Sequence, residues 1–81
     1  MEIKYVHPKM AENSLLLEAN RPNFEMVKYQ ILCPQNSVVR QGSFSGQAVF
    51  ISTRTLPKGV RFRIKILSAD RVLHDDVFET L

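Results

Sequence analysis

Few residues in this sequence could carry acid–base or metal chemistry. The candidates are His7, His74 and the acidic pair Asp75 and Asp76. A tight metal site needs three or four ligands that converge, usually from separate elements of the fold. On an extended segment His74 and Asp76 share one face, whereas Asp75 points the other way. We interpret these residues as polar side chains that keep an exposed edge strand hydrated. We predict neither a metal site nor a cofactor.

The nucleophilic side chains also lack the surroundings that catalysis requires. Residues 43–46, Ser-Phe-Ser-Gly, do not form the Gly-x-Ser-x-Gly turn that exposes a catalytic serine. Cys33, the single cysteine, precedes Pro34 at the end of an apolar run. No helix N-terminus or cation is predicted beside it to activate the thiol, so we interpret it as a small buried residue. The sequence therefore predicts a protein that is not an enzyme.

A group of basic residues is the most suggestive binding surface. Three of them alternate with apolar residues in segment 60–66, and two precede that segment. The candidate binding residues are Arg54, Lys58, Arg61, Arg63 and Lys65. One interpretation is a solvated sheet face whose charges discourage edge pairing. The other is an electrostatic contact with an acidic partner, such as an anionic polysaccharide, a protein or nucleic acid.

The placement of the aromatic residues disfavours nucleic acid as that partner. Proteins that bind single strands place aromatic side chains beside basic ones so that the bases can stack. Here Phe62 must face away from Arg61 and Arg63 on a strand. The other aromatic residues mostly lie in runs that are typical of a core: Tyr5, Phe24, Tyr29, Phe44, Phe50 and Phe78.

The elements that must position these residues follow a period of two. In segment 60–66, Val60, Phe62, Ile64 and Ile66 point one way and the basic residues point the other. This alternation predicts a strand with one buried face. Turns are predicted where Asn36 can take a left-handed conformation and where Gly59 can take a positive φ after Pro57. Pro34 ends the strand before the first of these turns.

The same alternation and turn residues along the whole chain predict about seven short strands. Residues 9–13 are predicted as a polar connection and residues 42–46 as a Gly- and Ser-rich loop. Residues 14–19 are ambiguous between helix and strand, and their length favours a strand. The expected strands are residues 3–6, 14–19, 27–33, 38–41, 47–52, 60–66 and 72–78. We predict an all-β, immunoglobulin-like antiparallel sandwich that forms a single domain over residues 1–81.

Length and composition agree with such a domain. The chain has 81 residues, a net charge of +3 and 44% hydrophobic residues. A domain this short buries only roughly 60% of the surface that its unfolded chain exposes, so its core is thin. A lone cysteine cannot form an internal disulfide. No stretch is long enough to span a bilayer, and residues 1–4 begin no apolar run of signal-peptide length.

The order of turns and strands resembles the C-terminal sorting domains of the Bacteroidetes type IX secretion system. Segments 6–9 and 14–17 are similar to the opening turn and the strand after it, and segment 33–39 is similar to the next turn and its Val-Val return strand. Segment 56–60, Leu-Pro-Lys-Gly-Val, is similar to the Leu-x-x-Gly turn, and segment 72–78 to the last strand. The chain departs from the family pattern at Cys33, Asn36 and Arg61 and at its acidic end.

The resemblance implies a non-catalytic module for secretion sorting, surface attachment or protein interaction. Such a module would be secreted or held at the cell surface and would be recognised by a protein partner. The alternative that the residues leave open is a stand-alone binding module for an acidic ligand, with the basic residues as its contact surface. Anionic polysaccharide or protein would be that ligand, with nucleic acid disfavoured.

Overall fold

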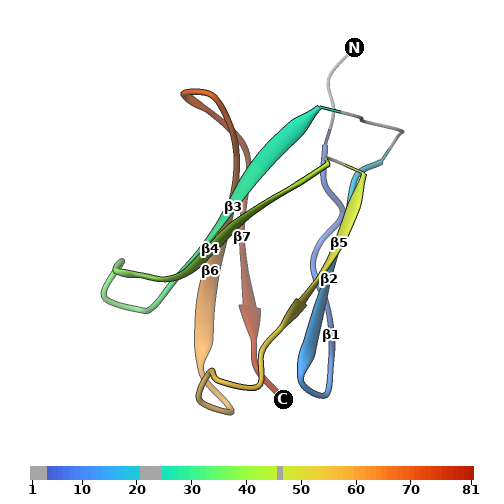
Figure 1. The fold of residues 1–81 in the computed structure, drawn as a ribbon. Coiled ribbons are helices and arrows are strands. Elements are labelled where there is room, and N and C mark those ends of the chain that lie inside the picture. Colours follow the sequence, from blue (N-terminus) through green and yellow to red (C-terminus); the bar gives the residue numbers. More distant parts are fainter. Residues whose placement is uncertain (1–3, 21–24, 46) are drawn as a thin grey trace.

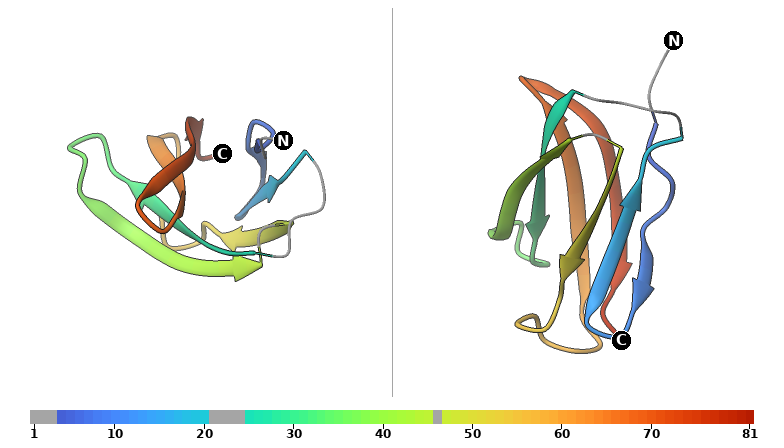
Figure 2. Two further views of the ribbon diagram at one scale, coloured as in Figure 1. Left: turned by 90° about the horizontal axis from the view of Figure 1, so that it is seen from above. Right: turned by 45° about the vertical axis from the view of Figure 1, so that its right-hand side comes forward.

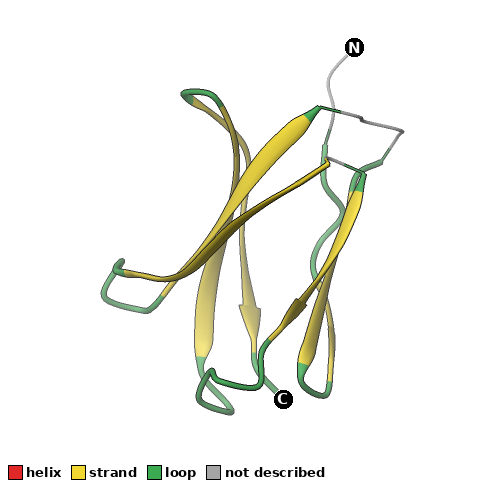
Figure 3. Cartoon of the chain, in the orientation of Figure 1, coloured by secondary structure: helices red, strands yellow, loops and turns green. Residues whose placement is uncertain are grey.

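Strands make up all of the regular structure in the described part of the chain. The computed structural model describes residues 4–20, 25–45 and 47–81, and no helix occurs among them (Figure 3). The strands in chain order are β1 (Lys9–Ala11), β2 (Ser14–Glu18), β3 (Met26–Leu32), β4 (Val38–Ser45), β5 (Ala48–Ser52), β6 (Arg61–Ser68) and β7 (Arg71–Glu79).

The strands form two antiparallel sheets packed face to face. The smaller sheet has the order β1-β2-β5 and the larger sheet the order β4-β3-β6-β7. In Figure 1 the larger sheet lies on the left and the smaller sheet on the right, and Figure 2 shows the same layers from two other directions. The predicted all-β, immunoglobulin-like sandwich is confirmed. In constant-type immunoglobulin domains the fourth strand pairs in the sheet of the first, second and fifth, whereas here β4 lies in the other sheet.

The alternation in β6 builds the centre of the core. Phe62, Ile64 and Ile66 are 3%, 0% and 0% exposed. They form one cluster with residues of the smaller sheet such as Leu15 and Leu17. Because fully burying such a side chain is worth about 1.5–3 kcal/mol, this strand face alone contributes a large part of the stability of a small domain. The predicted strand at 60–66 is confirmed, although it begins at Arg61 and continues to Ser68.

Left-handed backbone conformations occur where the chain turns. Asn36 has φ 65° after β3, and Gly59 has φ 69° before β6. Both were predicted from turn chemistry, and both are confirmed. Asn13 also has a positive φ, 66°, between β1 and β2. Asn is the non-glycine residue that best tolerates this conformation.

The first strand lies in a segment that the sequence predicts as a polar connection. That prediction is wrong, because Lys9–Ala11 forms β1 and pairs with β2. As an edge strand with mostly exposed side chains, β1 is held by backbone pairing across the Asn13 turn, so no hydrophobic pattern marks it. Within the predicted strand 3–6, residue 3 lies outside the described residues. In the described part of that segment, residues 4–6, the prediction of a strand is wrong, because Tyr5 makes only an isolated bridge to Ala19.

The Gly- and Ser-rich segment after residue 41 continues β4 instead of forming the predicted loop. Strand β4 extends to Ser45, and Gly42 lies directly opposite Tyr29 of β3. A Cβ atom at Gly42 would lie 2.7 Å from Cε2 of the Tyr29 ring. The glycine is therefore needed because the ring lies over its backbone, and it does not mark a loop. Residue 46 of that segment lies outside the described residues.

Phe50 was predicted to belong to the core, and that prediction is wrong. Its side chain is 74% exposed on the outer face of β5, whereas the next residue, Ile51, is buried. In the run Ala-Val-Phe-Ile the larger aromatic residue is not the buried one, because the register of β5 with β2 sets Ile51 opposite the buried Leu15. Phe24 lies outside the described residues.

We predict that Gly42→Ala lowers the free energy of unfolding by about 1–3 kcal/mol, as expected when a methyl group is forced into a filled space. The added Cβ must displace the Tyr29 ring, which also packs against Phe44. Urea unfolding of the two proteins measures the loss. In a Tyr29→Leu background the same substitution should cost much less. An equal cost in both backgrounds would show that the ring is not the obstacle.

Candidate functional site

The basic residues of β6 lie side by side on the outer face of the larger sheet. Arg61, Arg63 and Lys65 alternate with the buried residues, as predicted. Two carboxylates of β7 face this row: Glu79 is paired in register with Arg61, and Asp75 with Lys65. Three cations of β6 are therefore opposed by two carboxylates of β7, and the exposed Lys28 of β3 adds a fourth cation to the same face. The row is a surface of mixed charge and carries only a small net positive charge.

Arg63 forms the one ion pair of this outer face among the described residues. Its Nε lies 2.9 Å from Oδ1 of Asp75, and both side chains are partly exposed. An exposed pair of this kind contributes about 0–1 kcal/mol. Its main consequence is that the guanidinium is already partly engaged within the sheet.

The other two candidate binding residues lie on the loop between β5 and β6. Arg54 and Lys58 are both exposed. The Nζ of Lys58 donates a hydrogen bond to Oδ1 of Asn13 at 2.6 Å. Since Asn13 belongs to the turn of the smaller sheet, Lys58 reaches away from the row on β6. The structure therefore brings three of the five predicted residues together and places these two elsewhere.

A row of three apolar residues and one arginine crosses the same outer face. The sequence analysis did not predict it. Residues Val38, Leu32, Arg63 and Val77 lie opposite one another on four adjacent strands; we call them the outer row. Leu32 is only 6% exposed although it lies outside the core cluster, and the two valines are 45% and 43% exposed. The uninterrupted apolar run Ile-Leu-Cys at the end of β3 could have indicated it, because a strand with one wet face would place a polar residue there.

A shallow groove adjoins the outer row. It has a volume of about 220 Å³ and is lined by Arg61, Arg63, Val77 and the turn that begins at Pro34. Two of the predicted binding residues thus share a concave surface with apolar side chains.

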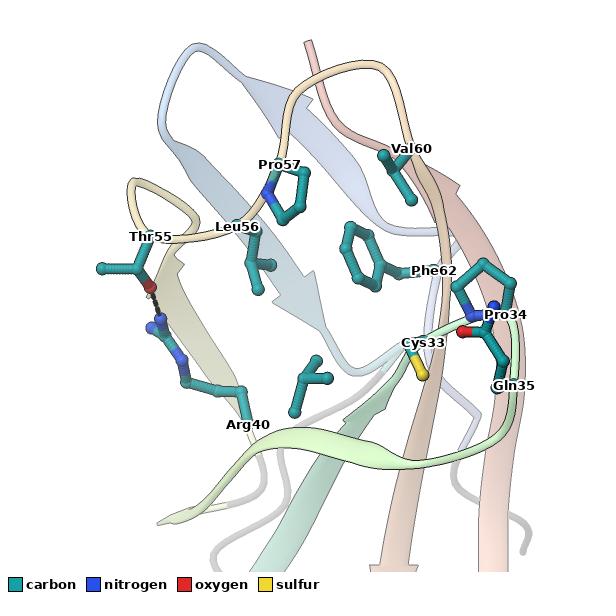
Figure 4. A pocket seen from close by; sticks show the side chains of 10 residues that line it. Cys33, Pro34, Gln35, Arg40, Thr55, Leu56, Pro57, Val60 and Phe62 are labelled. Carbon is teal, nitrogen blue, oxygen red and sulfur yellow. Dashed lines mark hydrogen bonds between the residues drawn. The ribbon is translucent and has the colours of Figure 1, made fainter.

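A larger cleft opens between the larger sheet and the loop that joins β5 to β6. Strand β4 and the β5–β6 loop stand on opposite sides of it (Figure 4). The cleft has a volume of about 490 Å³. Figure 4 shows Phe62, Leu56, Pro57 and Val60 around it and Arg40 at one end.

Arg40 lies at one end of this cleft, beside Thr55 (Figure 4). It is half-buried, and it lies opposite the buried Ile31 in the sheet register. Its Nη1 donates to the carbonyl oxygen of Ser52 at 2.8 Å, and its Nη2 donates to Oγ1 of Thr55. The side chain thereby ties β4 of one sheet to the end of β5 in the other.

Cys33 lies at the edge of both cavities. It is half-buried and packs against the core from its rim, so the prediction that it is buried is wrong. Hydrogen bonds from the Ser37 backbone and, to a smaller extent, from the Gln35 backbone lower the pKa of the Cys33 thiol. This cause differs from the helix N-terminus or cation that the sequence was searched for. The tight turn after β3 provides backbone donors instead.

The histidine and acidic residues of β7 are divided between its two faces. Asp75 faces outward, whereas His74 and Asp76 point inward and are half-buried. The Nδ1 of His7 lies 2.8 Å from Oδ2 of Asp76, and the Nε2 of His74 lies 3.3 Å from the same oxygen. The prediction that this group hydrates an exposed edge is wrong for His74 and Asp76. They lie on the inward face of β7, opposite Ile66 and Ile64, and Asp76 links β7 to the segment before β1 through His7.

This cluster does not have the arrangement of a metal site. Both imidazoles converge on a single carboxylate oxygen, and no group of three His, Cys, Asp or Glu residues in the described chain could hold a metal ion. Burial alone would raise the pKa of Asp76. Hydrogen bonds from the Val77 N–H and from His7, with the charges of His7 and His74, outweigh it and lower the pKa of that carboxyl.

No helix in the described residues could cross a membrane.

Comparisons with known proteins add little to this geometry. No family model matches the chain, and no curated protein matches it. Among solved structures, a β-glucuronidase from Ruminococcus gnavus, in complex with D-glucaro-d-lactam, is similar over 98% of this chain and 15% of that chain. The two share 12% sequence identity, with a TM-score of 0.49. A likeness this remote carries no functional argument, and the fold assignment rests on the strands themselves.

We predict that Asp76→Asn removes part of the acid sensitivity of the fold. Because the folded-state pKa of Asp76 is below its ordinary value of about 3.9, its contribution to stability is present above that value. It is lost as the pH falls through the lowered folded-state pKa. Urea midpoints between about pH 5 and pH 2.5 should fall less in Asp76→Asn than in the wild type.

The matched control for this experiment is Asp70→Asn, in the exposed turn before β7. Its urea midpoints should follow the wild-type pH dependence. Identical pH dependence in Asp76→Asn and the wild type would contradict the role assigned to the cluster.

Proposed function

We propose that the chain is a non-catalytic interaction module that binds a protein partner through the outer face of its larger sheet. The observation that carries the proposal is the outer row. An antiparallel sheet face that meets only water normally carries polar side chains at such positions. Here Val38, Leu32 and Val77 share one line across four strands, with the stem of Arg63 between them.

The composition of this face supports a protein interface. Leu32 is nearly buried at its centre, and the flanking valines keep almost half of their surface for contact. Interfaces combine an apolar centre and arginine with a polar rim. Arginines near such a centre are among the residues that contribute most to affinity. The charged residues around the outer row, Arg61, Lys65, Asp75 and Glu79, supply the rim.

The charges on this face favour a protein over a polyanion. Binding to a polyanion is driven by cations that neutralise its charges. On this face Arg63 is already paired with Asp75, and Glu79 lies opposite Arg61. A partner surface of mixed charge would satisfy both signs, whereas a nucleic acid or an anionic polysaccharide would meet two carboxylates. This supports the protein partner over the acidic ligand.

Secretion sorting is one form that this interaction would take. The partner would then be a component of the secretion machinery, and the protein would be secreted or held at the cell surface. That version rests on the resemblance of turns and strands alone and stays a prediction.

We predict that Val77→Asp weakens binding of the partner at least tenfold, equivalent to about 1.4 kcal/mol. The substitution places a charge in the apolar centre of the contact and changes stability little, because Val77 is 43% exposed. A photo-crosslinking residue at position 38, introduced in the native host, should form a discrete protein adduct. The Val77→Asp substitution should abolish that adduct.

Phe50 provides the matched control, because it is exposed on the opposite sheet. A crosslinker at position 50 should give no such adduct, and Phe50→Asp should leave the adduct from position 38 intact. Adducts of equal yield from both positions, or none from position 38, would contradict the proposal. Loss on Arg61→Glu with no effect of Val77→Asp would point to a purely electrostatic contact instead.

A further inference from the structure

We infer that the cleft between β4 and the β5–β6 loop binds a small amphipathic monocarboxylate, with its carboxylate on Arg40 and its hydrocarbon chain among the apolar side chains. This site is separate from the outer row and does not depend on it. The inference rests on the shape of the cleft, on the chemistry of its walls and on the electrostatic state of Arg40.

The walls of the cleft are apolar and preformed. Its volume of about 490 Å³ lies within the range of small-molecule sites, roughly 300–1,000 Å³. Phe62 and Leu56 belong to the core and are 3% and 7% exposed, so they form a firm floor. Val39, Pro57 and Val60 complete the walls. An unbranched hydrocarbon chain fits this surface, because each methylene that it buries adds about fourfold to affinity.

Arg40 is a cation that no carboxylate in the described residues neutralises. Its two hydrogen bonds go to a carbonyl and a hydroxyl, both of which are neutral. It forms no ion pair with any described carboxylate, although the side chain is half-buried. A guanidinium has five N–H donors in a fork that matches a carboxylate. Two bonds leave donors for a ligand, and a carboxylate would supply the missing negative charge.

The two sides of the cleft define an orientation for the ligand. Figure 4 shows Arg40 beside Thr55 at one end, while Cys33 and Pro34 lie across the cleft beyond Phe62. The carboxylate would take the Arg40 end, and the chain would extend over Phe62 toward Val60. Because Cys33 is the single cysteine and lines this cleft as well as the shallow groove, a ligand that fills the cleft should slow its alkylation, and the amide shifts show which cavity is filled.

The test compares octanoate with 1-octanol, which has the same chain without the negative charge. Octanoate should shift the backbone amide resonances of Val39, Leu56 and Val60 and should slow alkylation of Cys33 by iodoacetamide. Octanol should bind at least tenfold more weakly. This comparison uses the wild-type protein, so it does not depend on a variant that folds.

Variants then test whether Arg40 causes the preference for octanoate over octanol. Arg40→Gln should lower the affinity for octanoate at least tenfold, to the level of octanol, and Arg40→Lys should retain part of the preference. Arg54→Gln, on the exposed β5–β6 loop, should bind like the wild type. The inference is overturned if octanol binds as tightly as octanoate, if Cys33 is not protected, or if Arg40→Gln binds octanoate like the wild type.

Discussion

The packing of one face of β6 against the smaller sheet is the interaction on which the rest of the structure depends. Ile64 and Ile66 are completely buried, and their strand is paired on both sides, with β3 and with β7. A shift of the register by one residue would bury Arg63 and expose both isoleucines. In a domain this small no disulfide compensates for such an error, so this one face fixes both the register and the orientation of its neighbours.

The same register positions each of the surfaces described above. Outward from β6, Arg63 lies between Leu32 and Val77 and so becomes part of the outer row. Inward, Phe62 forms the floor of the cleft between β4 and the β5–β6 loop, while Ile64 lies opposite Asp76. The outer row and the cleft therefore lie on opposite faces of one alternating strand. Substitutions of its core residues should disturb both surfaces. A substitution at Val77 should affect only the outer row, and one at Arg40 only the cleft.

Local patterns predicted much of the fold, and contacts between distant residues explain the remainder. The β6 alternation and the turn at Gly59 depend on neighbouring residues, so the sequence reveals them. By contrast, β1 is defined by its pairing with β2, and Gly42 by a ring from another strand. Arg61, Arg63 and Lys65 were predicted as outward residues from β6 alone. The contact between His7 and Asp76, and the reach of Arg40 across the sheets, join elements that no local pattern relates.

Amide hydrogen exchange measured residue by residue tests this account most directly. If the β6 face organises the sandwich, the amides of β6 and of its central partner β3 should exchange most slowly, at the rate of global unfolding. The amides of the edge strands β1 and β5 should exchange faster through local opening. Exchange in β6 as fast as in β1 would contradict the central role of this strand.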